Sequence, residues 1–528
     1  MTNCVSTILV LLWLQWGRFD LTADQRYSIS SQTRDVVEQI DAPLHIQILL
    51  DEGKMNPGFQ RLKQATYDLT EELETLSPYL QVVHGSVPQN LNLQPIVVHE
   101  RSNNGQMVQT QLYPYALVRY KERLRIVSLL QNNPGRSGEE NLNSSIESLE
   151  YRFAEAFNGL IRPRTDKVAF IEGHGELTEQ ETYDWCRELS RYYQIDRGVL
   201  DTDAGVLDGY RAVVVASPSA ALSENDKFIL DQYIMKGGRV MWLLDGVRFS
   251  DDMLQSDGLT PVIAEDWGLR DLLFRYGVRI NPVLVQDLQC RMMPVEVSGD
   301  KDNSQFQPMP WTFAPLLLTD NNSPITKNIA QVMCMMASEV ERVGGEDSID
   351  KHILLATSTA SRKIGVPAEV DLTDMTIAPD LFQMAFIPVA MSLEGEFTSL
   401  YAHRMSPKDI QVPSIKKKSE RTRQVVVACG RVAINEWQQG EPLPLGYDRY
   451  MQTQFGNRDF LTNCILWLTD ENNLMALRGK HVQLRLLNDH RSYQLKSKIQ
   501  TVSLSVPIAI LALVGASVYL IRRKKYVV

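Results

Sequence analysis

Four polar side chains in the central part of the chain have the chemistry of an active or binding site: His174, Glu176, Ser217 and Asp245. Each of them follows a short apolar run, and the carboxyl ends of strands are where open α/β sheets bind ligands. His174 and Glu176 could act as a general acid–base pair, and Ser217 could supply a nucleophilic hydroxyl. The four side chains therefore form a candidate binding cleft at the strand ends.

The sequence around these residues favours binding over catalysis. His174 and Glu176 lie in the segment EGHGE, which a polar turn flanked by glycines explains without any reaction. Ser217 lies in ASPS, which lacks the G-x-S-x-G pattern of a nucleophile elbow. Asp245 alone would bind a metal weakly, because metal sites need several ligands. We therefore predict no catalytic residue, no metal site and no bound cofactor.

The stretch 167–246 must position these side chains. Short apolar runs alternate there with segments of helix length, and this pattern predicts βαβ units and a parallel sheet. The runs lie at residues 167–171, 210–218 and 237–246. We assign the sheet to a larger α/β domain with insertions, residues 163–475. Further elements expected in it are a helix at 267–276, a strand at 278–285, a mobile basic loop at 405–423 and a helix at 459–468.

An earlier region, residues 41–162, is predicted to form a smaller α/β domain. Its expected elements are a strand at 44–50, a helix between Pro57 and Pro78, a strand at 80–83, a hairpin at 115–130 and a closing helix from 142 to 160, with a looser stretch before the hairpin that turns at 103–105. The order β-α-β and then β-β-α predicts a thioredoxin-like fold. No CxxC motif stands at the start of the first helix, so redox chemistry has no nucleophile there.

Both ends of the chain are apolar. Residues 501–521 are uncharged and precede Arg522, Arg523, Lys524 and Lys525, which predicts a transmembrane helix with a cytoplasmic basic tail at 522–528. The uncharged run at 4–16 would span roughly 20 Å as a helix, less than the ~30 Å hydrocarbon core of a bilayer. We expect residues 1–17 to form a short membrane anchor, with a signal peptide as the alternative.

If both ends cross the membrane, the body of the chain lies outside the cytoplasm. In a bacterium with two membranes this places it in the periplasm, with the protein held in the inner membrane. Residues 18–40 would be a juxtamembrane segment and residues 476–500 a stalk. The formal net charge of −10 argues against nucleic acid as the main partner, because phosphate binding needs clustered Lys and Arg.

Several short motifs recur in one protein family when they are taken together. They are RFDLT (18–22), RYSIS (26–30), EGHGE (172–176), WTFAPL (311–316), PLGYD (444–448), FGNRDF (455–460) and LRLL (484–487). In this combination the chain closely resembles GldG, the family of gliding-motility-associated ABC transporter components, over nearly its whole length. The central domain of that family is similar to one found in an intraflagellar-transport protein and, more distantly, to the flavodoxin-like domain of class I glutamine amidotransferases.

The resemblance implies an accessory, substrate-binding-like subunit of an ABC transporter. Its permease and its ATPase would be separate chains similar to GldF and GldA, which agrees with the lack of a P-loop: Leu474 stands where the first glycine before Gly479-Lys480 would be. The extracytoplasmic body would bind the permease, an exported substrate, or motility and secretion components of the cell envelope. Amidotransferases carry a nucleophilic Cys where Leu244 stands, and leucine forms no thioester.

Two other functions stay open at this point. One is a membrane-anchored hydrolase or amidotransferase-like enzyme that uses His174, Glu176, Ser217 or Asp245. The other is a scaffold protein of the cell envelope.

Overall fold

The protein is described by a computed structural model for residues 29–50, 56–84, 87–88, 91, 93, 95–101, 107–131, 137–161, 166–296, 306–344, 348–372, 377–410, 414–479 and 489–526. The chain forms two compact units, Met1–Lys480 and His481–Val528. The predicted N-terminal anchor at 1–17 lies outside the described residues, and so do residues 51–55, where a CxxC motif would stand. An apolar core in the first unit runs from Ile29 to Leu477. The predicted domain boundary at 162–163 stays a prediction.

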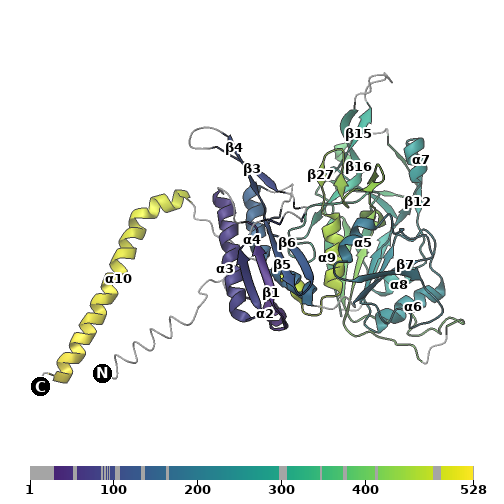
Figure 1. Cartoon of the computed structure of the whole chain (residues 1–528). Helices are drawn as coiled ribbons and strands as arrows, with labels where there is room; N and C mark the ends of the chain where they lie inside the picture. Colours follow the sequence, from purple (N-terminus) through teal and green to yellow (C-terminus); the bar gives the residue numbers. More distant parts are fainter. Residues whose placement is uncertain are drawn as a thin grey trace. The chain divides into compact units, whose positions relative to one another are not determined.

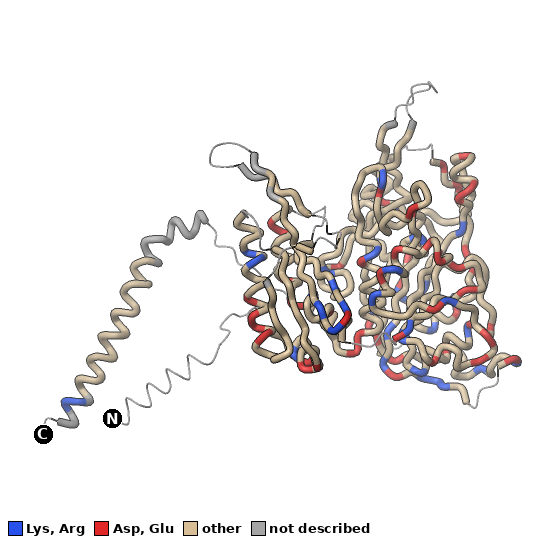
Figure 2. The backbone as a smooth tube through the Cα atoms, in the orientation of Figure 1, with Lys and Arg blue, Asp and Glu red and all other residues tan. Residues whose placement is uncertain are grey.

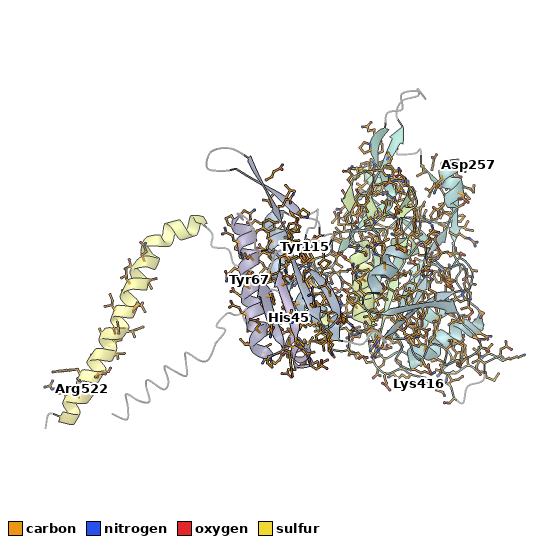
Figure 3. The ribbon with its side chains drawn as sticks, in the orientation of Figure 1. His45, Tyr67, Tyr115, Asp257, Lys416 and Arg522 are labelled. Atoms are coloured by element: carbon orange, nitrogen blue, oxygen red, sulfur yellow. The ribbon has the colours of Figure 1, made fainter. Side chains whose placement is uncertain are left out.

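Four strands form the sheet of the N-terminal region: β1 (Leu44–Ile48), β2 (Leu80–His84), β5 (Tyr115–Tyr120) and β6 (Arg123–Ser128). Their order is β2-β1-β5-β6, with β2 parallel to β1, β5 antiparallel to β1, and β6 antiparallel to β5. Leu44, Ile46 and Ile48 are buried because alternate side chains of a strand share one face. Figure 3 labels His45 on β1 and Tyr115 on β5. The thioredoxin-like classification stays a prediction.

Three helices accompany this sheet: α2 (Ser31–Glu38), α3 (Pro57–Leu76) and α4 (Gly138–Ile161). The start of α3 is determined by Asn56, whose side chain accepts a hydrogen bond from the backbone N–H of Phe59 at 3.0 Å, and by Pro57 in the first turn. α4 contacts both α2 and α3, as well as β5 and β6 (Figure 1). The order β-α-β and then β-β-α, with a closing helix, is therefore present.

The structure contains one hairpin in this region that the sequence did not predict. Strands β3 (Ile96–Arg101) and β4 (Met107–Leu112) pair antiparallel where a looser stretch was predicted. The predicted turn at 103–105 lies outside the described residues. Val97 is 45% exposed. A hairpin with an exposed apolar side chain lacks the alternation of buried and polar residues by which a strand is recognised in a sequence.

A second, larger sheet organises the central region. Its parallel half consists of β8 (Gln194–Val199), β7 (Lys167–Glu172), β9 (Ala212–Ala216), β10 (Val240–Leu243) and β23 (Thr422–Val427). Its antiparallel half continues with β22 (Pro388–Gly395), β19 (Ile349–Ala356), β16 (Phe306–Thr319) and β15 (Cys290–Glu296). The parallel strands confirm the predicted βαβ pattern, but the sheet as a whole is mixed, and the flavodoxin-like classification stays a prediction. β15, β16, β19 and β22 pair antiparallel, which needs no long crossover connection between neighbouring strands, whereas β23 returns to lie parallel to β10.

The parallel strands are buried on both faces. Val168 and Phe170 of β7 belong to one apolar core, whereas Ala169 and Ile171 belong to another. The first core also contains side chains of α5 (Tyr183–Leu189) and α9 (Asn457–Leu468), and the second contains side chains of α6 (Glu224–Met235) and α8 (Arg270–Arg275). The sheet is thus covered by helices on both sides, as parallel sheets require (Figure 1).

Three expected elements differ from the structure. The helix expected at 267–276 is shortened to α8, because Gly268 adopts a φ of +72°, outside helical geometry. The strand expected at 278–285 is divided at Pro282 into β13 (Val278–Asn281) and β14 (Val283–Asp287), which pair with different strands. The end of the expected basic loop is ordered, since Arg423 lies in β23 and its Nε lies 3.2 Å from a carboxylate oxygen of Glu394.

The remaining elements of the first unit are short. They are β11 (Val247–Arg248), α7 (Asp251–Ser256), β12 (Leu259–Ala264), β17 (Val332–Met333), β18 (Glu339–Arg342), β20 (Ser361–Gly365), β21 (Ala368–Asp371), η1 (Pro379–Leu381), η2 (Gly430–Ala433), β24 (Trp437–Gln438), β25 (Glu441–Pro442), β26 (Tyr447–Asp448), β27 (Thr453–Gln454) and η3 (Leu474–Gly479).

The second unit contains one long helix, α10 (Asp489–Tyr526), drawn in yellow in Figure 1. Within it, Gln500–Leu520 is the one segment of the described residues that is long and apolar enough to cross a membrane. Its large apolar side chains are exposed, with Leu504 at 68% and Leu511 at 71%. The part of the predicted stalk from 489 to 500 is helical and continues into this segment, so the boundary expected at 500–501 is not a break in secondary structure.

Candidate functional site

Backbone hydrogen bonds hold the loops at the carboxyl ends of β7, β9, β10 and β23 together. The N–H of Leu177 donates to the carbonyl of Ala216 at 2.9 Å, and the N–H of Ser217 donates to the carbonyl of Leu243 at 2.7 Å. The N–H of Leu244 donates to the carbonyl of Val427 at 2.9 Å. The four predicted side chains lie in these loops, so the structure places all of them at one edge of the sheet.

His174 is held between two carboxylates. Its Nδ1 lies 3.1 Å from Oε1 of Glu176, and its Nε2 lies 3.1 Å from Oδ2 of Asp226. Glu176 also accepts a hydrogen bond from the backbone N–H of His174 at 2.7 Å. Both ring nitrogens therefore have partners within the protein. This arrangement makes His174 a link between the β7 loop and α6.

Asp226 is a site residue that sequence reasoning did not include. Its carboxylate accepts a hydrogen bond from the backbone N–H of Ser223 at 3.1 Å, and its own backbone N–H donates to the Ser223 hydroxyl oxygen at 3.2 Å, which makes a complete capping box at the start of α6. A capping box identifies a helix start in a sequence, but it gives no sign that the same carboxylate also reaches a histidine 52 positions earlier. The contact depends on how α6 packs against the sheet.

Ser217 and Asp245 form a separate pair. The Ser217 hydroxyl donates to Oδ2 of Asp245, and Oδ1 of Asp245 accepts the backbone N–H of Gly430 at 2.7 Å. Burial raises the pKa of Asp245 above its usual range, while these two donors and the positive charge of Arg431 act in the opposite direction. Ser217 has a φ of +54°, a conformation that is uncommon for residues other than glycine. The carboxylate of Asp245, in the loop after β10, thus connects Ser217 with the loop after β23.

Gly430 is the second residue that sequence reasoning missed, and it makes this pair possible. A Cβ at Gly430 would lie 2.4 Å from Cβ of Ser217 and 2.6 Å from Oδ2 of Asp245. Only glycine leaves room for the serine and the carboxylate at the start of η2. No local pattern marks this glycine, because the atoms that it would meet come from distant parts of the chain.

The geometry does not form a Ser-His-Asp triad. His174 has Glu176 and Asp226 as its partners, whereas Ser217 has Asp245. A triad needs the histidine between the serine and the acid, so that it can accept the hydroxyl proton. Leu244, at the position of the amidotransferase nucleophile, is fully buried in the core that also contains α6. Among the described residues, no group of three or more His, Cys, Asp or Glu side chains has the arrangement of a metal site.

Two of the sequence motifs hold neighbouring loops in place. Asp448 of PLGYD is fully buried, and its carboxylate accepts a hydrogen bond from Nε of Arg291 at 3.0 Å. Asn457 of FGNRDF accepts the N–H of Met333 at 3.0 Å and donates to its carbonyl at 2.8 Å. Both residues pair with segments more than one hundred positions away. These contacts give the motif residues a structural role.

The cavities described by the structure lie away from the four predicted side chains. One cavity of about 810 Å³ is lined by residues of α8, β13 and the loop at Leu400 and Arg404. Another, of about 970 Å³, is lined by residues of β6, α4, α5, α9 and η3. His174, Glu176, Ser217 and Asp245 line neither of them, so the candidate cleft at the strand ends stays a prediction.

Comparison with known proteins gives two family matches. A family model described as "ABC-type uncharacterized transport system" matches residues 165–464, and one described as "Domain of unknown function (DUF7088)" matches residues 23–119. A search among curated proteins gives no match. Four chains of solved structures match. One of them is the "mmIFT52 N-terminal domain", with 13% identity, 58% of this chain and 97% of that chain covered, and a TM-score of 0.32.

The crowding around Gly430 predicts the effect of a single methyl group. Gly430→Ala should lower the unfolding free energy by about 1–3 kcal/mol, because the new Cβ forces Ser217 and Asp245 apart. Gly209→Ala is the matched control, since a Cβ there meets nothing within 4 Å. Thermal unfolding of both variants measures the difference. Equal melting temperatures for the two variants would contradict the tight contact described here.

Proposed function

Since the chain belongs to the family described as "ABC-type uncharacterized transport system", we propose that it is a non-catalytic accessory subunit of an ABC transporter. In this proposal the body of the chain lies outside the cytoplasm and binds the permease, an exported substrate, or both. The observation that carries it is the extent of the family match, which covers 300 of the 528 residues, including the parallel strands and most of α9.

Two further features support this role. The segment Gln500–Leu520 is a candidate membrane span, which would keep the body close to a membrane-embedded permease. The sequence before Gly479-Lys480 lacks the glycine of a P-loop, so ATP hydrolysis in such a system would be the work of another chain. Nucleotide-driven motion of the permease would then shift the conformation of the bound accessory subunit.

We further propose that the transporter serves gliding motility, as the resemblance to GldG implies. The permease and the ATPase would then be similar to GldF and GldA, and the body would lie in the periplasm near motility or secretion components. The N-terminal region, as a thioredoxin-like module without a CxxC motif, would bind or pack and not carry out redox chemistry. A scaffold in the cell envelope is the outcome to expect if no transporter is bound.

The alternative of an enzyme rests on one pair of residues. The Ser217 hydroxyl donates a hydrogen bond to the carboxylate of Asp245. Burial raises the pKa of Asp245, so that it could accept a proton more readily. Against this, the histidine that commonly activates a serine is bound elsewhere. Both ring nitrogens of His174 contact carboxylates of the protein and not Ser217, and this favours the accessory role.

Co-purification tests the proposed role directly. The full chain carrying an affinity tag, extracted in a mild detergent, should bring down an ABC permease and an ATPase in defined ratios. A tagged membrane protein with one unrelated span serves as the control for nonspecific capture. Recovery of the chain without either partner would contradict an accessory role in an ABC transporter.

Membrane topology can be tested with two matched cysteine variants. Asp257 is exposed at the end of α7 and is labelled in Figure 3, and Arg523 is exposed beyond the candidate span. In spheroplasts, a thiol reagent that does not cross membranes should label Asp257→Cys at once and Arg523→Cys only after permeabilisation. Wild-type protein gives the background from the natural cysteines. Labelling in the reverse order would show that the body lies in the cytoplasm.

Removal of one hydroxyl distinguishes the binding role from the enzymatic one. Ser217→Ala takes away the only hydroxyl among the four predicted side chains and adds no bulk. We expect this variant to restore growth and motility in a deletion strain as well as the wild type does, because binding does not need the hydroxyl. Loss of complementation by a variant that still folds and still co-purifies with the transporter would support the enzyme.

A further inference from the structure

The cavity of about 970 Å³ is lined by more basic than acidic residues, although the chain as a whole is acidic. The chain has a formal net charge of −10, and Figure 2 shows acidic and basic segments interspersed along the first unit. The cavity, in contrast, is lined by seven Lys or Arg residues and five Asp or Glu residues. Its walls come from β6 and α4 of the N-terminal region and from α5, α9 and η3 of the central region. All of these elements belong to the first unit.

Two of the acidic residues in the wall are already neutralised. Glu155 pairs with Arg125 at 2.7 Å, and the Arg125 guanidinium also lies over the ring of Tyr192, 4.1 Å from its centroid. Glu188 pairs with Arg191 at 3.0 Å. These pairs account for two cations and two anions, and they leave an excess of positive charge among the other lining residues.

Arg152 on α4 and Arg478 in η3 carry part of this excess. In the described part of the chain neither of them forms an ion pair. Arg152 donates to the backbone carbonyl of Ser128, and Arg478 donates to the backbone carbonyl of Lys327 at 2.7 Å. A guanidinium has five N–H donors, so each has donors to spare.

These cations also repel one another. Burial and the charge of Arg478 lower the pKa of Arg152 to about 10, while the nearby Asp459, Tyr151 and Glu155 act in the opposite direction. Burial lowers the pKa of Lys327 as well, with Arg478 adding to the effect and Glu147 opposing it. Like charges that are held together in a protein raise its free energy, and an anion placed between them would remove that cost. The cluster is therefore suited to receive negative charge from outside the chain.

Two uncharged polar atoms of residues in the same wall have no hydrogen-bond partner in the described part of the chain. Thr462 on α9 is 6% exposed, and its hydroxyl has no hydrogen-bond partner among the described residues. Oε1 of Gln131, which follows β6, is likewise buried and unpartnered in that part of the chain. A buried polar atom without a partner costs about 1–3 kcal/mol. Both residues line the cavity, so a bound molecule could supply the missing hydrogen bonds.

We propose that this cavity binds a small molecule bearing phosphate or carboxylate groups, with Arg152 and Arg478 as its charge partners and Thr462 as a hydrogen-bond partner. Arginine matches these oxyanions because its parallel N–H groups can bind two oxygens at once. The cavity volume lies at the upper end of the range of about 300–1,000 Å³ found for small-molecule sites. The ligand would contact α4 and η3 together. This site is independent of the proposed transport role.

Thermal unfolding of the full chain in detergent tests the site. Inorganic phosphate and citrate are added separately at a few millimolar, with sodium chloride of equal ionic strength as the reference. We expect at least one of the two anions to raise the melting temperature, and the one that does identifies phosphate or carboxylate chemistry. Failure of both anions to shift the melting temperature would overturn the proposal.

Matched variants separate binding in the cavity from general salt effects. Arg152→Gln and Arg478→Gln should lose most of the shift, whereas Arg187→Gln, an exposed residue of α5 outside the cavity wall, should keep it. Thr462→Val, which keeps the volume, should melt higher than the wild type without anion and show a smaller shift with it. An equal shift in the wild type and in Arg478→Gln would overturn the proposal, and a full shift in Thr462→Val would remove the hydroxyl from the site.

Discussion

Both faces of the parallel strands in the central sheet are buried, and the arrangement of the first unit depends on this constraint. Every residue of β10 from Val240 to Leu243 is fully buried. A strand in this position must place apolar side chains on both sides and satisfy its backbone groups through its neighbours. β9 and β23 provide those hydrogen bonds, and α9 and α6 cover the two faces. Polar side chains then gather where the strands end, and that edge is where the candidate residues lie.

At that edge the polar groups form hydrogen bonds with one another. His174 joins two carboxylates, Asp245 joins a serine and a backbone N–H, and Gly430 leaves the room that this second group needs. Groups that are engaged in this way rigidify the loops, because each hydrogen bond connects segments that are distant in sequence. A rigid edge suits a protein that presents a fixed surface to a partner, which supports an accessory role in transport.

Buried Arg291 and half-buried Arg152 and Arg478 illustrate the difference between a charge that is paired within the fold and one that could bind a ligand. Arg291 lies 3.0 Å from Asp448 and 3.0 Å from Glu436, so its charge is balanced within the fold. Arg152 and Arg478 donate to backbone carbonyls, and the charge of Arg478 acts on both Arg152 and Lys327. The pair of Arg291 and Asp448 connects β15 to β26. In the cavity wall, Asp459 and Glu155 favour the charged form of Arg152 while burial and Arg478 oppose it. Solvent or a bound anion would add to that compensation.

The sequence by itself determined the local elements. The apolar periodicity of α3, the run of β10 and the uncharged stretch of Gln500–Leu520 were readable, because such patterns depend on residues close together in the chain. Only the tertiary structure decided that β15, β16, β19 and β22 join the sheet as antiparallel strands. It also decided that Asp226 reaches His174 and that Gly430 adjoins Ser217. It also brought Arg152 and Arg478 to one cavity. Each of these contacts joins segments far apart in sequence, and local spacing holds no information about which distant segments will pack together.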